Sequence, residues 1–138
     1  MFKNRLDLFL ILSCMVEMMC CLYFLNQLTI FQFMFFAQIL PSLLLALIMG
    51  RIANRVPNKV LILTLSGVIY SCAMYVLMKH TPMVAIEANT VQSATSVFEF
   101  NREIHFVSYV GFFLQEFFLT AFVMIMTKVF NKIKLGIF

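Results

Sequence analysis

The sequence predicts an all-α membrane protein with four transmembrane helices and both termini in the cytoplasm. The chain of 138 residues is 63% hydrophobic and only 12% charged, which is about half the charged fraction of a soluble domain. Its apolar residues form four runs, each close to the length that a helix needs to cross the hydrocarbon core. Its basic residues gather at the ends of these runs, as they do in membrane proteins of defined orientation.

The first span is predicted at about residues 6–25. The basic start of the chain, with Lys3 and Arg5 ahead of an apolar run, raises the alternative of a secretory leader. The run is longer than the apolar core of a leader, and no small-residue cleavage motif closes it. We therefore expect a retained first helix.

The second and third spans are predicted at about residues 30–50 and 60–78. A polar break at 26–29 separates the first two spans, and a short basic turn at 51–59 joins the second to the third as a tight hairpin. Helices are expected because the backbone must satisfy its own hydrogen bonds in lipid. Pro41 predicts a kink in span two.

The segment at 79–103 is too polar to cross a membrane. Apolar residues within it recur at helical spacing: Val91, Ala94, Val97 and Phe98. This spacing predicts an amphipathic helix lying at the outer membrane surface. The fourth span is predicted at about residues 104–127, with lysines closing the chain. Together, residues 1–138 are expected to form a single integral membrane domain.

The distribution of basic residues predicts the orientation. Eight of the ten Lys and Arg residues fall on one side of this topology: Lys3, Arg5, Arg51, Arg55, Lys59, Lys128, Lys132 and Lys134. Lys79 and Arg102 fall on the other side. Because Lys and Arg are retained on the cytoplasmic side, the richer side is predicted to be cytoplasmic. The net charge of +4 is thus explained by orientation, and no nucleic-acid partner is expected.

Two carboxyl groups, Glu17 and Glu116, lie near the middle of the first and last spans. A charge at the centre of an inserted helix costs about 2.5–3.5 kcal/mol, and no Lys or Arg lies at the same depth. We therefore expect neutral, hydrogen-bonded carboxyls, with Gln38 and Gln115 as candidate neighbours. One hypothesis is a proton or cation site, with coupled titration where the two carboxyls approach each other. The other is a structural hydrogen bond between helices.

Small residues repeat at intervals of four on the second and third spans. The members of this pattern are Ser42, Ala46 and Gly50 on one span and Gly67 and Ser71 on the other. Small side chains allow helix backbones to approach closely, and such packing drives helix association in lipid. We predict that these residues form helix–helix interfaces.

The four cysteines all lie within apolar runs: Cys14, Cys20, Cys21 and Cys72. They are expected to be free thiols that pack as small, soft core residues. Cys14, Glu17 and Cys21 share one helical face, a spacing that a soft metal can use, but it is a weak signal without a Cys-x-x-Cys motif. No metal or other cofactor is expected. Phosphate-binding and nucleophile motifs are absent from the sequence, so an enzyme is not expected.

The segment Gly50-Arg-Ile-Ala-Asn-Arg-Val-Pro-Asn-Lys59 resembles a loop of the major facilitator superfamily. In that family, the loop between helices two and three reads Gly-x-Leu-Ala-Asp-Arg-x-Gly-Arg-Arg. The residues of this chain that form the motif are Gly50, Arg51, Ala53, Arg55 and Lys59, whereas Asn54 replaces the acidic residue. The resemblance covers about residues 6–78, and full members of the family have about twelve spans built as repeats.

The resemblance implies a small transporter-like protein of a bacterial cytoplasmic membrane. Four helices enclose little space, so we expect the chain to act as a homo-oligomer or with a membrane-protein partner, with proton-linked transport as one option. The alternative is a non-transporting accessory or immunity protein. Such a protein would bind another membrane protein or a membrane-active peptide through the outer segment at 79–103.

Overall fold

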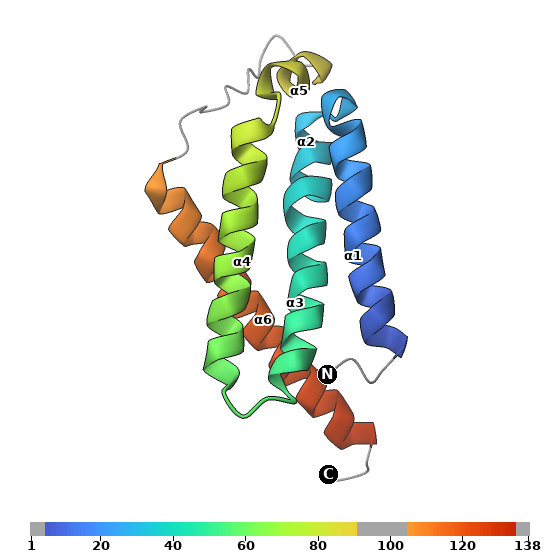
Figure 1. The fold of residues 1–138 in the computed structure, drawn as a ribbon, viewed down its shortest axis with the longest axis vertical. Helices are drawn as coiled ribbons and strands as arrows, with labels where there is room; N and C mark the ends of the chain where they lie inside the picture. Colours follow the sequence, from blue (N-terminus) through green and yellow to red (C-terminus); the bar gives the residue numbers. More distant parts are fainter. Residues whose placement is uncertain (1–4, 91–104, 135–138) are drawn as a thin grey trace.

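The apolar runs fold into long helices separated by short polar breaks (Figure 1). The computed structural model describes residues 5–90 and 105–134. The elements in chain order are α1 (Arg5–Phe24), η1 (Leu25–Gln27), α2 (Ile30–Phe33), the π-helical segment η2 (Met34–Ile39), α3 (Leu40–Ala53), α4 (Lys59–His80), α5 (Met83–Asn89) and α6 (Phe106–Lys134).

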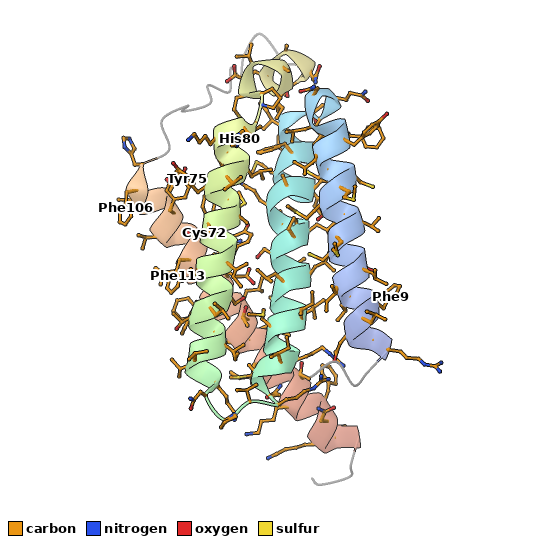
Figure 2. All side chains as sticks on the ribbon, viewed as in Figure 1. Phe9, Cys72, Tyr75, His80, Phe106 and Phe113 are labelled. Carbon is orange, nitrogen blue, oxygen red and sulfur yellow. The ribbon has the colours of Figure 1, made fainter. Side chains whose placement is uncertain are left out.

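Within the described residues, four helical segments are long and apolar enough to cross a membrane: Arg5–Gln27, Ile30–Ala53, Lys59–His80 and Phe106–Ile133. Large apolar side chains cover their outer surfaces, as for Phe9 on α1, which is 67% exposed (Figure 2). Exposed apolar side chains on this scale fit lipid rather than water as the surrounding solvent. The predicted all-α fold with four spans is confirmed.

The helices α1, α3 and α4 stand side by side, and α6 crosses obliquely behind α3 and α4 in the view of Figure 1 and packs against both. The start of α1 and the end of α6 lie at the end of the bundle that holds the α3–α4 turn, as four spans require. We call this the basic end. Its placement on the cytoplasmic side stays a prediction.

Small residues allow α6 to lie close to both of its neighbours. A Cβ atom added at Gly50 would lie 2.8 Å from Cγ1 of Val123 and 3.0 Å from the Met124 nitrogen. One added at Gly67 would lie 2.7 Å from Cδ2 of Phe113. Ser42 and Ala46 are buried in the same region, and Ser71 donates a hydrogen bond to the Tyr109 carbonyl at 3.0 Å. Gly50, Gly67 and Ser71 therefore line the interfaces with α6.

The predicted kink region of span two contains the π-helical segment η2. Pro41 lies two residues after its end and has no N–H to donate to the preceding turn. The Leu40 N–H donates to the Phe35 carbonyl, five residues back, and the Tyr70 hydroxyl donates to the Gln38 carbonyl at 3.0 Å. Segments of this kind accommodate one extra residue in a helix, often beside functional sites.

A short helix, α5, closes the end of the bundle opposite the basic end. Asn89 donates its side-chain amide to the Asn26 carbonyl at 2.8 Å, and Thr90 Oγ1 accepts from the Ile30 N–H at 3.0 Å. Ile86, within α5, is fully buried. The sequence did not predict this cap. The residues of the predicted amphipathic helix, Val91, Ala94, Val97 and Phe98, lie outside the described residues.

The last helix extends beyond its predicted end at Thr127 and continues through Lys134. No proline or glycine interrupts the chain between Gly111 and Gly136, so the helical pattern is not broken. Lysines are also favourable in the last turns of a helix because of its dipole. Lys128 and Lys132 therefore belong to α6 rather than to a tail after it.

Candidate functional site

Glu116 is fully buried where α6 crosses α3 and α4. Its Oε2 accepts a hydrogen bond from Ser42 on α3 at 2.7 Å. Its Oε1 accepts from Ser66 on α4 at 3.1 Å and from Thr120, one turn further along α6, at 3.2 Å. The Ser66 and Thr120 hydroxyl oxygens also lie 2.9 Å apart, so either hydroxyl can donate to the other instead of to Glu116. Both carboxyl oxygens are thus satisfied, and the cluster joins three helices.

The partners of Glu116 differ from those that the sequence predicted. Gln115 is the next residue on the helix, so it points about 100° away around the axis, and it is exposed. Gln38 lies in η2, where its carbonyl accepts from Tyr70. Ser66 and Thr120 were not predicted as partners from the sequence. Thr120 could have been predicted, because residues four apart on a helix, such as Glu116 and Thr120, lie on the same face.

Glu17 on α1 has the opposite environment. Both of its carboxyl oxygens are buried, and neither has a hydrogen-bond partner among the described residues. Glu17 is one of the residues that line a cavity of about 420 Å³ between α1 and the start of span two. The other residues lining this cavity, which we call the Glu17 pocket, are Cys20, Cys21, Phe24, Gln27, Leu28, Gln32, Phe36 and Leu40.

The two carboxyls do not hydrogen-bond to each other. The helix that carries Glu17 packs against α3 and η2, whereas the helix that carries Glu116 packs against α3 and α4. The two carboxyls therefore lie in different hydrogen-bonding environments, and their coupled titration stays a prediction.

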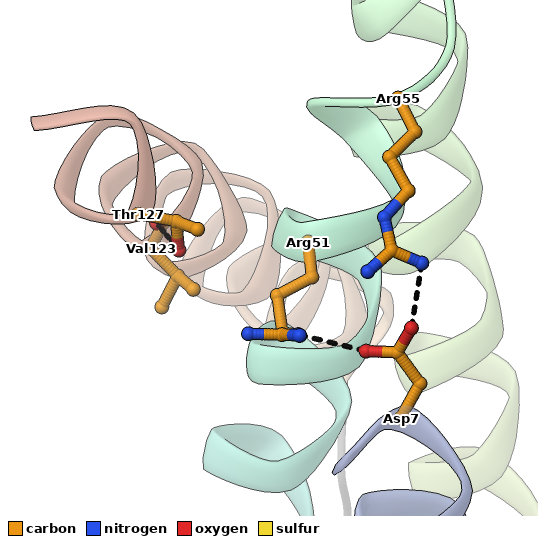
Figure 3. Close-up of polar contacts among 5 residues, drawn as sticks. All are labelled: Asp7, Arg51, Arg55, Val123 and Thr127. Carbon is orange, nitrogen blue, oxygen red and sulfur yellow. Dashed lines mark hydrogen bonds and ion pairs between the residues drawn. The ribbon is translucent and has the colours of Figure 1, made fainter. Parts of the chain in front are cut away.

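The basic turn is attached to α1 through an acidic residue that the sequence analysis missed. Asp7, only 5% exposed, accepts hydrogen bonds from Arg51 Nε at 2.8 Å and from Arg55 Nη1 at 2.6 Å (Figure 3). Asn54 donates to the Met124 carbonyl at 2.9 Å, which ties the same turn to α6. A carboxylate shared by two guanidinium groups forms strong, charge-assisted bonds. Asp7 could have been predicted as a partner of these arginines, because the start of span one and the basic turn at 51–59 lie at the same side of the predicted membrane topology.

The remaining residues of the loop motif have structural positions. Gly50 and Ala53 are buried, and Lys59 is exposed at the start of α4. Groups of three or more His, Cys, Asp or Glu side chains placed to hold a metal do not occur within residues 5–90 and 105–134. Cys14, Cys20, Cys21 and Cys72 are free thiols.

The two carboxyl environments differ in what they can do chemically. Both carboxyl oxygens of Glu116 accept hydrogen bonds, whereas both oxygens of Glu17 are buried without a partner among the described residues, and Glu17 lines a cavity. A buried polar group without a partner is rare in native structures and requires an explanation. The Glu17 pocket is therefore the candidate functional site. No protein-family model, curated protein or solved structure matches this chain.

Proposed function

We propose that this chain is a small transporter-like subunit of a bacterial cytoplasmic membrane and that the Glu17 pocket accepts a proton or a cationic group. The observation that carries the proposal is the pair of buried carboxyl oxygens on Glu17 that have no partner among the described residues. Burying a polar group without a hydrogen bond costs about 1–3 kcal/mol in proteins. A proton or a bound cation offsets that cost.

The shape of the pocket supports the same proposal. A volume of about 420 Å³ lies within the range of small-molecule sites. Its walls are mostly apolar, and Gln27 and Gln32 supply polar groups toward one end. An apolar cavity with one acidic group discriminates for a proton or a small positively charged group and against anions.

The position of the pocket supports action with a second subunit. Phe24 and Phe36 line it and are 46% and 41% exposed, so α1 and η2 form its wall at the edge of the bundle. A neighbouring copy or a partner membrane protein packed against these rings would close the pocket from lipid. This arrangement agrees with the oligomer or partner expected from the small number of spans.

Proton movement into proteoliposomes tests the proposal. The full chain is reconstituted with a pH-sensitive dye inside the vesicles, and a potassium diffusion potential drives proton entry. Glu17→Gln keeps the shape of the side chain but removes its ionisation, so we expect proton movement to be lost. Glu116→Gln is the matched control, because its carboxyl is already satisfied within the bundle, and it should retain proton movement.

Elution as a single species in size-exclusion chromatography verifies that both variants are folded. Equal proton movement in wild-type protein and in Glu17→Gln would contradict the proposal. The absence of movement in wild-type protein would favour the accessory or immunity function instead.

A further inference from the structure

A second cavity lies at the basic end of the bundle, where the start of α4 meets the last turns of α6. Its volume is about 330 Å³. We call it the lysine pocket, and it is lined by Asn54, Lys59, Met124, Ile125, Lys128, Val129 and Lys132. This cavity shares no lining residue with the Glu17 pocket and does not depend on its proposed function.

The lysines of this pocket have no ion-pair partner among residues 5–90 and 105–134. Lys128 and Lys132 lie four residues apart on α6, so their ammonium groups share one face and repel each other. Within the described residues, neither they nor Lys59 form an ion pair, and Asp7, which lies at this end of the bundle, bonds to two arginines. Three positive charges around one cavity favour an anion inside it.

The start of α4 adds to this preference. The helix is 22 residues long, its N-cap residue Asn58 makes no side-chain capping bond, and its first turn carries no acidic residue. The N–H groups at the start of a helix lack partners within the helix and carry partial positive charge. An uncapped helix start is therefore a natural position for a phosphate group.

The wall of the lysine pocket is apolar and continues onto the outer surface of α6. Met124, Ile125 and Val129 form this wall, and Ile125 and Val129 are 55% and 38% exposed. A free phosphate ion would use only the lysines and the helix start. A lipid uses these groups for its phosphate and the apolar surface for an acyl chain.

We infer that the lysine pocket binds the phosphate group of an anionic phospholipid. Lys59, Lys128 and Lys132 surround the headgroup, and an acyl chain lies along the outer face of α6. In the predicted orientation the pocket opens at the cytoplasmic leaflet, whose anionic lipids attract juxtamembrane lysines.

Native mass spectrometry of the full chain tests this inference. Protein purified in detergent is mixed with equal amounts of phosphatidylglycerol and phosphatidylcholine, and the retained lipids are counted. We expect phosphatidylglycerol to be preferred. Lys128→Gln and Lys132→Gln should each weaken its retention about fivefold, whereas Lys128→Arg should preserve it. Lys79→Gln is the matched control, because Lys79 is an exposed lysine at the other end of α4.

Three results would overturn the inference. The first is equal retention of phosphatidylglycerol by wild-type protein and by both glutamine variants. The second is an equal loss in Lys79→Gln, because that would indicate non-specific attraction. The third is displacement of the lipid by excess inorganic phosphate down to the level of the variants, because the site would then take a free phosphate ion. Unchanged melting temperatures would exclude misfolding of the variants.

Discussion

Ser42 on α3 donates a 2.7 Å hydrogen bond to Glu116 on α6 across a sequence separation of 74 residues. Both side chains are at most 1% exposed. In lipid no water competes for such a bond, so it sets the register of the two helices at the depth of the carboxyl. This contact identifies Glu116 as a structural residue and distinguishes it from Glu17.

Two replacements of Glu116 should show whether the stability of the protein depends on the hydrogen bonds of this side chain or on its ability to ionise. Glu116→Gln retains a side-chain oxygen that accepts and adds an amide that donates, so we expect a change in stability below about 1 kcal/mol. Glu116→Ala removes the acceptor of the Ser42 hydroxyl, leaves Ser66 and Thr120 only their bond to each other, and should cost about 1–3 kcal/mol. Thermal unfolding in detergent measures the difference. Equal losses for the two variants would contradict a role as a hydrogen-bond acceptor.

Replacement of Gly67 by alanine should destabilise the contact between α4 and α6. The added Cβ would lie 2.9 Å from the Phe113 carbonyl oxygen, and a backbone atom cannot move aside as a flexible side chain can. We expect a loss of about 1–3 kcal/mol from overpacking, which exceeds the gain of about 1 kcal/mol in helix propensity.

Gly111→Ala is the matched control for Gly67→Ala. A Cβ at Gly111 meets nothing within 4 Å, so only the propensity gain remains and stability should be unchanged or higher. Melting temperatures that fall equally in both variants would show that the close approach at Gly67 has no specific effect.

Replacement of Asp7 by asparagine should loosen the basic turn. Arg51 and Arg55 each donate to this carboxylate, and hydrogen bonds to charged groups are worth about 1.5–3 kcal/mol when buried. Because the two arginine side chains are 23% and 37% exposed, solvent reduces that value, and we expect a loss of about 1–2 kcal/mol. Arg5→Gln, at an exposed position, is the control. Protease cleavage at the turn should increase in Asp7→Asn alone.

Cysteine labelling should establish the orientation of the bundle. In a variant without native cysteines, single cysteines are placed at Ala88 in α5 and at Asn58 before α4, both exposed and at opposite ends of the bundle. A membrane-impermeant maleimide added to whole cells should modify position 88 and spare position 58, because the basic end is predicted to face the cytoplasm. The reverse pattern would invert the orientation, and equal labelling would contradict the four-span topology.

Composition and pattern along the chain were sufficient to predict the four spans, because each must satisfy its own backbone and present about 20 apolar residues to lipid. The small residues at intervals of four could also be predicted from the sequence, because residues four apart lie on the same face of a helix whatever it packs against. The end of α6 was misplaced because the continuous apolar run is broken by Lys128, whereas the helix continues through Lys134 with further apolar residues between the lysines.

The partners of the polar side chains were decided only by the tertiary structure. Glu17 and Glu116 look alike in sequence, at mid-span with no basic neighbour, yet Glu116 has three hydroxyl donors and Glu17 has none among the described residues. The donors Ser42 and Ser66 come from other helices, and Asp7 reaches arginines more than 40 residues away. A helix pattern specifies which face a side chain occupies. Which helix covers that face depends on how α6 crosses α3 and α4, and that crossing is set by close packing at Gly50 and Gly67.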